Sequence, residues 1–513
     1  MRRYEQAKSK ITAGIIGSLD FQSRFSSIIS SNNLITSSFG CSSLEGWSQV
    51  LGTRPNCLIF EIGLNYSQKD HAWLKDFLAQ LRNRFKNEIY IVVALLAPEK
   101  LFYGGDLLFK DGNDGEPSCL VDTFIAQPPA GFSDVPSIES QLIQCLSLIS
   151  YEVERRDSGL PPTPPLAADG WVHSLADPQS RELWMLWLPR YASYTNDNPI
   201  ITGPTGAGKT RLAKALHILS GRTGPFVSIT PRDFSSSELV QAELFGAVAG
   251  AYTGAVDKWG LVKSAENGTL FIDELQSIDK DLQGKLITFI ENKSYRRVGS
   301  AETIQANVRF VFATNRTISE MVRTDTLRDD FAYRLERVQL NLAALNHRRL
   351  DITAGLAYSL AKIRRQRPQA SHIFGISSDA YRLLFGYNWP GNLRQLENAV
   401  AKLCELADIS GKAVIEDDIV REVFDTKLDF LPTNTAELVS SAAQRLTKSA
   451  LSQKVSTLED GAIALRNEAR AIALELSNGD PGKAAKILGE NRNVLDIFLS
   501  ARIAKDQLDS RLK

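Results

Sequence analysis

The sequence predicts an α/β chain of several domains. Two observations support this: apolar, strand-like runs alternate with amphipathic stretches in the N-terminal third, and a strand, a glycine-rich loop and a helix follow one another at residues 199–219. A third observation separates the two regions. Residues 155–170 hold four prolines within six positions (161–166), and neither a helix nor a central strand tolerates that density.

Composition limits the protein classes that the chain can belong to. The 513 residues carry 59 Lys plus Arg and 59 Asp plus Glu, so the formal net charge is zero, and bulk electrostatic binding to nucleic acid is excluded. A hydrophobic fraction of 43% is typical of a folded globular protein. Five scattered cysteines without a CxxC pair indicate a reducing compartment, so we expect a cytoplasmic protein. The apolar run 89–98 is too short to span a bilayer, so we expect no membrane association.

The N-terminal third predicts a parallel sheet with helices on both faces. Its apolar runs are expected to be strands, and its amphipathic stretches are expected to be helices. The strands are 11–18, 34–39, 56–62, 90–96 and 120–126, and the helices are 23–30, 44–51, 72–85 and 138–156.

The glycine-rich loop has the sequence GPTGAGKT. It follows an apolar strand and opens a helix, which is the context that a P-loop requires. Its glycines let backbone N–H groups surround phosphates at a helix N-terminus, a lysine reaches the terminal phosphates and a hydroxyl binds Mg²⁺. The loop predicts ATP as a ligand, bound by Gly203, Pro204, Thr205, Gly206, Ala207, Gly208, Lys209 and Thr210.

A second motif, TLFIDEL at residues 269–275, complements the loop. The apolar strand delivers Asp273 toward Mg²⁺, and Glu274 beside it is placed to orient and polarise an attacking water. Alone, the motif leaves open a second interpretation, a buried strand that ends in a solvated acidic pair. Together with the P-loop it predicts ATP hydrolysis.

Between these motifs lies a run of small residues around one aromatic ring. By itself it predicts only a flexible hairpin or loop. The run is Gly250, Ala251, Tyr252, Thr253, Gly254 and Ala255. Here the chain closely resembles the AAA+ domain of sigma-54-dependent transcription activators, the bacterial enhancer-binding proteins, whose hallmark loop is GAFTGA. The resemblance implies that the Tyr252 ring engages the sigma-54 factor.

The resemblance extends over about 250 residues. Residues 281–300 are similar to the segment after the family's acidic pair, and residues 308–315 to its sensor I strand, which nominates Asn315. Residues 327–335 are similar to its arginine-finger segment, which nominates Arg328 and Arg334, and residues 389–400 to its lid helix, which nominates Arg394 as sensor II. The family's geometry implies that the two finger arginines act on a neighbouring subunit, so the active form would be a ring, a hexamer.

The chain departs from the family pattern at three places. Thr230 replaces an Asn that restrains the catalytic glutamate in the family, residues 247–249 (Ala-Val-Ala) replace polar residues before the loop, and Asn346 replaces an expected Arg. None removes a hydrolytic group, but Thr230 puts the restraint on Glu274 in question.

The N-terminal third resembles a response-regulator receiver domain that has lost its chemistry. Glu61 stands at the phosphoacceptor position. Gly17 and Ser18 replace the expected acidic pair, Ala94 replaces the hydroxyl residue and Gln127 replaces the lysine. We therefore expect a two-component-like pseudo-receiver. A plain dimerisation module would lack the same acids.

The C-terminal tail resembles a Fis-type helix-turn-helix. Its recognition helix would begin near Arg492 and Asn493, whose side chains could reach base edges. Residues 465–513 carry nine basic and seven acidic side chains, a net +2, so DNA binding by one copy should be weak. A helical dimerisation tail is the alternative.

These expectations combine into one hypothesis. The chain would be an ATP-hydrolysing activator that remodels the closed promoter complex of sigma-54 RNA polymerase holoenzyme from an upstream DNA site. The rivals are a DNA-binding regulator of non-sigma-54 promoters that uses its AAA+ domain for oligomerisation and ligand sensing, and a AAA+ remodelling ATPase with a non-promoter target. The expected parts are a pseudo-receiver (1–154), a linker (155–170), a AAA+ P-loop NTPase domain (171–427, with a helical lid from about 341), a second linker (428–460) and the helix-turn-helix (461–513).

Overall fold

The protein is described from a computed structural model. The described residues are 11–30, 35–41, 55–85, 88–109, 120–132, 134–157, 175–367, 372–424, 467, 469–474, 477 and 480–488. They divide into two compact units: one spans the positions up to Pro128, Val135–Ile376 and Trp389–Val414, and the other spans Pro129–Asp134, Ser377–Asn388 and the positions from Ile415 onward. Within the described ranges, no helix is long and apolar enough to cross a membrane.

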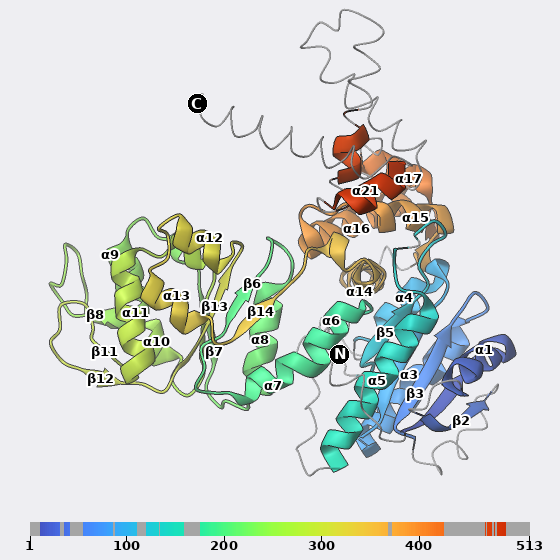
Figure 1. Ribbon diagram of the computed structural model, residues 1–513, viewed down its shortest axis with the longest axis horizontal. Coiled ribbons are helices and arrows are strands. Elements are labelled where there is room, and N and C mark those ends of the chain that lie inside the picture. The colour runs from blue at the N-terminus through green and yellow to red at the C-terminus, as the bar shows by residue number, and fades with distance from the viewer. Residues whose placement is uncertain are drawn as a thin grey trace, which may run out of the picture. The chain divides into compact units, whose positions relative to one another are not determined.

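The first unit begins with a five-stranded, all-parallel sheet in the order β2-β1-β3-β4-β5 (Figure 1). This is the doubly wound order of flavodoxin-like and receiver domains, and it confirms the receiver-like part of the predicted α/β fold class. All five predicted strands are present. They are β1 (Ile11–Ile16), β2 (Ile35–Cys41), β3 (Cys57–Ile62), β4 (Tyr90–Leu95) and β5 (Thr123–Ala126).

Helices cover both faces of this sheet. Helices α1 (Leu19–Ser30) and α5 (Ile138–Asp157) pack on one face, where Phe25 and Leu146 are fully buried. The buried residues of helix α3 (Gln68–Phe85) are not part of the core cluster that contains Phe25 and Leu146. The helix begins with a capping box, in which Asp70 N donates to Ser67 Oγ and Ser67 N donates to Asp70 Oδ2. Apolar residues on both faces explain why every residue of β4 is buried.

Two N-terminal predictions need comment. The predicted helix 44–51 lies outside the described residues. Helix α5 continues to Asp157, so the predicted linker starts inside a helix at 155: Glu152 and Arg155 form an i,i+3 ion pair that extends it.

Helix α4 (Leu101–Asp106) was not predicted, because LFYGGD contains two glycines and no helical period. Its packing explains the glycine: a Cβ on Gly105 would lie 1.8 Å from the carbonyl oxygen of Ala357 on helix α14 (Leu350–Gln366). Only glycine permits this contact between the two helices.

The central part of the first unit contains a second parallel sheet in the order β14-β6-β13-β10-β7. Fully buried phenylalanines such as Phe271 and Phe312 fill its two faces. Its strands are β6 (Ile200–Thr202), β7 (Phe226–Ile229), β10 (Thr269–Ile272), β13 (Arg309–Thr314) and β14 (Gln339–Asn341).

Helices surround this second sheet. One face carries α9, α10, α11, α12 and α13, and the other carries the short helical turn η4 (Leu183–Trp187), α7 and α8. Their bounds are α6 (Pro178–Glu182), α7 (Leu188–Ser193), α8 (Lys209–Leu219), α9 (Ser237–Phe245), α10 (Leu261–Ser264), α11 (Lys280–Asn292), α12 (Ile318–Arg323) and α13 (Asp329–Leu335), and short antiparallel pairs join β8 (Gly246–Ala247) with β9 (Lys258–Trp259) and β11 (Ser294–Tyr295) with β12 (Ile304–Gln305).

Helical segments follow the second sheet. Helices α14 and α16 (Asn392–Ile409) pack on one another in the first unit. In the second unit, α15 (Ser378–Gly386) packs on α17 (Asp417–Val423), and Tyr387 and Phe424 hold their rings 4.7 Å apart. The described part of the tail includes α21 (Pro481–Leu488).

Candidate nucleotide-binding site

The P-loop connects β6 to α8, as predicted. Its glycines are required by backbone and by space: Gly203, Gly206 and Gly208 have φ of 154°, 77° and 108°. A Cβ on Gly206 would lie 2.3 Å from the carbonyl oxygen of Gly391, and one on Gly203 would lie 2.5 Å from that of Leu342. The loop is therefore held closely between the end of β14 and the start of α16.

A cavity of about 330 Å³ lies beside the loop and brings most of the predicted residues together. Its volume is at the lower end of the range for small-molecule sites. Its lining includes Thr205, Gly206, Gly208, Lys209, Thr210, Asp273, Glu274, Asn315 and Arg394. Gly203, Pro204 and Ala207 complete the loop outside this lining.

Lys209 is mostly buried, and its ammonium is held by two backbone carbonyls. Nζ donates to Gly203 O at 2.9 Å and to Pro204 O at 3.2 Å. Burial lowers the pKa of Lys209 and Arg394 acts in the same direction, whereas Asp273 and Glu274 raise it. A phosphate group bound in the cavity would give the Lys209 ammonium an anionic partner in place of neutral carbonyls, so the residues fit a nucleotide.

The acidic pair follows β10 at the carboxyl edge of the sheet. Asp273 N donates to Ile229 O at 3.0 Å, and Asp273 Oδ1 accepts from Glu274 N at 2.8 Å. Glu274 has φ 53° and ψ 52°, the left-handed region that non-glycine residues rarely adopt. This turn directs its carboxylate to Arg232, whose Nη1 lies 3.2 Å from Oε2 and 3.3 Å from Oε1. Sequence reasoning missed Arg232; its position two residues after Thr230 was the available signal.

The polar end of β13 reaches the same cavity. Asn315 lines it, and Thr314 Oγ1 donates to Gln276 Oε1 at 2.9 Å on the turn after Glu274. Asn392, at the start of α16, donates from Nδ2 to Thr205 O at 2.9 Å and accepts at Oδ1 from Leu345 N at 2.7 Å. Neither Gln276 nor Asn392 was predicted.

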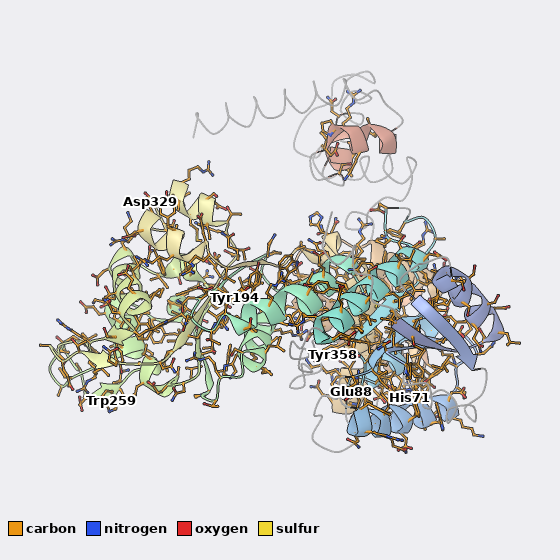
Figure 2. All side chains as sticks on the ribbon, turned by 60° about the horizontal axis from the view of Figure 1, so that its bottom comes forward. His71, Glu88, Tyr194, Trp259, Asp329 and Tyr358 are labelled. Carbon is orange, nitrogen blue, oxygen red and sulfur yellow. The ribbon has the colours of Figure 1, made fainter. Side chains whose placement is uncertain are left out.

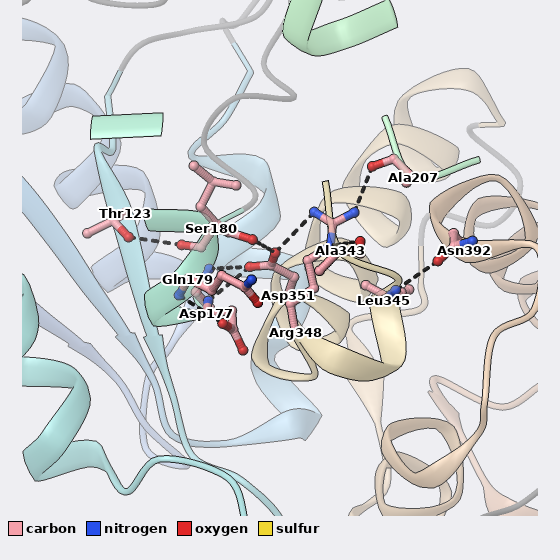
Figure 3. Close-up of polar contacts among 12 residues, drawn as sticks. Thr123, Asp177, Gln179, Ser180, Ala207, Ala343, Leu345, Arg348, Asp351 and Asn392 are labelled. Carbon is pink, nitrogen blue, oxygen red and sulfur yellow. Dashed lines mark hydrogen bonds and ion pairs between the residues drawn. The ribbon is translucent and has the colours of Figure 1, made fainter. Parts of the chain in front are cut away.

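A buried polar network extends from the P-loop to the N-terminal sheet. Arg348 donates from Nη2 to Ala207 O at 2.7 Å and from Nη1 to Asp351 Oδ2 at 3.3 Å. Asp351 accepts from Ala176 N at 2.9 Å and from the Ser180 hydroxyl, and Figure 3 shows the contact with Ser180. Arg348 and Asp351 are 4% and 1% exposed, so these polar groups lie in the protein interior.

The two nominated finger arginines lie away from this chain's own cavity. Arg328 pairs with Asp330 at 2.8 Å, and Arg334 pairs with Glu291. The two arginine side chains are partly exposed, at 42% for Arg328 and 44% for Arg334. Tyr333, next to Arg334, is 73% exposed.

The loop 250–255 is a tight exposed turn. Gly250 and Gly254 have φ of 80° and 81°, and Ala255 N donates to Tyr252 O at 2.9 Å. Thr253 and Gly254 are exposed, while Ala251 and Tyr252 are half-buried. Nearby, Trp259 on β9 is 55% exposed, with the Arg297 guanidinium 4.5 Å above its ring; Figure 2 labels this residue. The loop thus exposes small groups beside one half-buried ring.

The remaining predicted residues have two different outcomes. Arg492 and Asn493 lie outside the described residues. In the N-terminal sheet, Glu61 Oε2 accepts from Ser18 N at 2.6 Å at the start of α1. The carboxylate that stands at the phosphoacceptor position is therefore used by the domain's own backbone.

Comparison with known proteins agrees with this geometry. Residues 187–341 match the Sigma-54 interaction domain family, and residues 346–430 match the AAA+ ATPase lid domain family. The alginate biosynthesis transcriptional regulatory protein AlgB of Pseudomonas aeruginosa is 36% identical over 276 residues, 52% of this chain and 58% of AlgB. The DNA-binding transcriptional regulator NtrC of Rhizobium meliloti is 32% identical over 311 residues, 58% of this chain and 63% of NtrC.

A solved structure is also similar. NtrX from Brucella abortus in complex with ADP superposes with a TM-score of 0.47 at 22% identity, covering 96% of this chain and 99% of NtrX. The sequence matches span 58% of the length of AlgB and 63% of the length of NtrC. The two family matches place a sigma-54 interaction domain at residues 187–341 and its AAA+ ATPase lid at residues 346–430 of this chain.

Proposed function

We propose that the chain hydrolyses ATP in a ring of subunits and uses the energy to remodel the closed promoter complex of sigma-54 RNA polymerase. The observation that carries this proposal is the cavity of about 330 Å³, where the P-loop, the acidic pair, Asn315 and Arg394 face one another. The membership of this domain in the sigma-54 interaction family supports the choice of partner.

Each residue of the cavity has a role that follows from its chemistry. Lys209 leaves its carbonyl partners to bind the terminal phosphates, and Glu274 orients and polarises the attacking water. Asn315 and Arg394 contact the transferred phosphoryl group from the sheet and the lid. Catalysis here is positioning and charge stabilisation.

Mg²⁺ fits this site through a small set of protein oxygens. In the part of the chain that the structure describes, no three His, Cys, Asp or Glu side chains gather to hold a metal ion. Thr210 and Asp273 would supply two ligands, and the substrate phosphates would supply others. Bound there, the ion would neutralise charge on the phosphate oxygens.

Arg328 and Arg334 complete the site of a neighbouring subunit. A guanidinium is always protonated and can bind two phosphate oxygens, so it stabilises charge that develops during transfer. Both lie outside the lining of their own cavity and are partly exposed, which suits a role in trans. The ring, a hexamer by family resemblance, would then be a condition for turnover.

The loop 250–255, the C-terminal tail and the N-terminal domain have proposed roles beside the ATPase domain. The loop around Tyr252 would contact sigma-54 in the cytoplasm, and the tail with Arg492 and Asn493 would bind an upstream DNA site weakly, with multimers compensating through effective concentration. The N-terminal domain would act as a pseudo-receiver that gates assembly without phosphorylation.

A sigma-54 capture experiment tests this function. The full chain is incubated with sigma-54 and ADP–aluminium fluoride, a mimic of the transition state, and complex formation is measured by gel filtration. We expect a complex with the mimic and none with ADP. Thr253→Ala should hydrolyse ATP normally and lose the complex, because only the exposed loop is changed.

The matched control is Thr288→Ala, which removes another exposed threonine hydroxyl from the same domain. A Thr253→Ala chain that still forms the complex would refute the loop assignment. ATP hydrolysis without any sigma-54 complex would favour a regulator of other promoters.

A further inference from the structure

The carboxylate of Glu274 lies in an ion pair that sequence reasoning did not anticipate. Its partner is Arg232 on the 3-10 turn η5 (Pro231–Asp233), with Nη1 3.2 and 3.3 Å from the two carboxylate oxygens. Among the described residues, no hydrogen bond joins the Thr230 side chain to Glu274. Restraint at this position is thus not supplied by Thr230.

Hydrogen bonds hold the main chain of Glu274, so only its side-chain torsion angles can change the direction of the carboxylate. Its N–H donates to Asp273 Oδ1 at 2.8 Å, and its carbonyl accepts from Ser277 N at 2.8 Å and Ser277 Oγ at 2.7 Å. With the backbone held in the left-handed region, rotation about the side-chain bonds decides where the carboxylate points. It lines the nucleotide cavity and also reaches Arg232.

Arg232 also stands on the chain path between the hydrolytic site and the exposed loop. The order is β7, then η5 with Arg232, then α9 (Ser237–Phe245), then β8 and the loop 250–255. Movement of the loop can therefore reach Arg232 through α9 without crossing the sheet.

We propose that Arg232 is a positioning residue that restrains Glu274 and couples its release to the loop. The inference rests on the proposed function, in which Glu274 activates water. While the pair is formed, the carboxylate is held to the guanidinium and does not polarise the water. When the loop engages its partner, η5 moves, the pair opens and Glu274 turns to the attacking water.

The expected effect is small, because the pair is accessible to solvent. The Arg232 and Glu274 side chains are 72% and 29% exposed. Exposed ion pairs are formed only part of the time and contribute at most about 1 kcal/mol. Loss of the pair should raise the basal kcat of ATP hydrolysis about two- to fivefold.

The test measures basal ATP hydrolysis by the full-length chain without sigma-54. Arg232→Ala should raise kcat about two- to fivefold with KM for ATP unchanged, and Arg232→Lys should restore the low rate. Thr230→Asn in the Arg232→Ala background should restore it as well, since Asn stands there in the family. The matched control is Arg337→Ala: Arg337 is 75% exposed and pairs with Asp197 at 3.5 Å, outside the cavity.

Ionic strength gives a readout that a purely structural role would not move. Salt screens an exposed pair, so basal kcat of the unmodified chain should rise with added KCl more than that of Arg232→Ala. An unchanged or lower kcat in Arg232→Ala, with the same salt dependence as the unmodified chain, would overturn the inference. Glu274→Gln is measured in parallel: if it still hydrolyses ATP, the proposed function fails, whereas its inactivity beside an unchanged Arg232→Ala leaves that function standing and removes only the restraint.

Discussion

The first unit contains two parallel sheets, and each places a glutamate near the carboxyl edge of a central strand. Glu61 in the N-terminal sheet accepts a 2.6 Å hydrogen bond from Ser18 N, and a Cβ on Gly17 would lie 2.6 Å from the same oxygen. Glu274 in the central sheet lines a cavity of about 330 Å³, and its carboxylate pairs with the exposed Arg232. In the same architecture, the Glu61 carboxylate is thus occupied by a hydrogen bond from the backbone, whereas the Glu274 carboxylate is accessible to a ligand. Function depends on these edge residues and not on the fold.

The largest expected effect tests this difference directly. Glu274→Gln should keep ATP binding and lower kcat for hydrolysis by about 10²–10⁴, because a general base is lost. Glu61→Gln, the same change at the other sheet, should leave kcat within about twofold, since its carboxylate only caps Ser18. Single-turnover hydrolysis and ATP binding are measured for both. Undiminished hydrolysis by Glu274→Gln would break the comparison.

A second prediction concerns charge that the N-terminal region uses for stability. Asp106 is 9% exposed, and its carboxylate accepts from His71 Nε2 at 3.0 Å, Lys75 Nζ at 2.8 Å and Arg365 Nη2 at 2.8 Å. Asp106→Asn should lower the free energy of unfolding by about 3–5 kcal/mol, because it removes the carboxylate that buried cations share. Urea unfolding measures this.

The control is Glu139→Gln, which removes an exposed pair with Arg24 and should cost less than about 1 kcal/mol. Burial acts to raise the pKa of Asp106, and the hydrogen bond from His71 with the charges of Lys75 and Arg365 outweighs it, so the pKa is lowered. The stabilisation is therefore present above the unfolded pKa of about 4 and is lost as the pH falls below it. Equal losses in the two variants would contradict a special role for Asp106.

A third prediction is a pH slope at the segment that joins the two sheets, smaller per pH unit than the loss expected for Asp106→Asn. Burial and then the nearby Asp351 raise the pKa of Asp177 to about 7. The folded chain then binds a proton that the unfolded chain releases above about pH 4, so stability should fall as the pH rises from 4 to 7, by at most about 1.4 kcal/mol per pH unit.

Asp177→Asn should remove this slope while keeping an acceptor for the cap on Gln179 N. Urea unfolding from pH 5 to 8 gives the measurement. A slope that persists in the variant would assign the titration to another group.

Much of the architecture could be predicted because it depends on local pattern. β4 (Tyr90–Leu95) and β10 (Thr269–Ile272) are apolar runs that must be buried, and the P-loop glycines have φ angles that other residues avoid. Order along the chain was then enough for the fold class. Helix α4 could not be predicted, because its Gly105 is required by a contact with the backbone of Ala357, which is distant in the sequence.

The site was only partly predictable, for a related reason. Lys209 and Asp273 belong to motifs whose spacing carries their chemistry. Arg232 and Asn392 act through contacts with Glu274 and with the Thr205 carbonyl, 42 and 187 positions away. No pattern within one segment records such a pair.

Arg181 has a practical consequence for dissecting the chain. This residue of α6 is fully buried and donates to Thr123 Oγ1 at 3.0 Å, to Phe124 O at 2.8 Å and to Gln144 Oε1 at 2.5 Å, all in the N-terminal part. A fragment that starts after the proline-rich segment would keep the guanidinium and lose these three acceptors. The boundary that the sequence offers for truncation is therefore a poor cutting point. An excised ATPase fragment should be made with Arg181 replaced by a neutral polar residue.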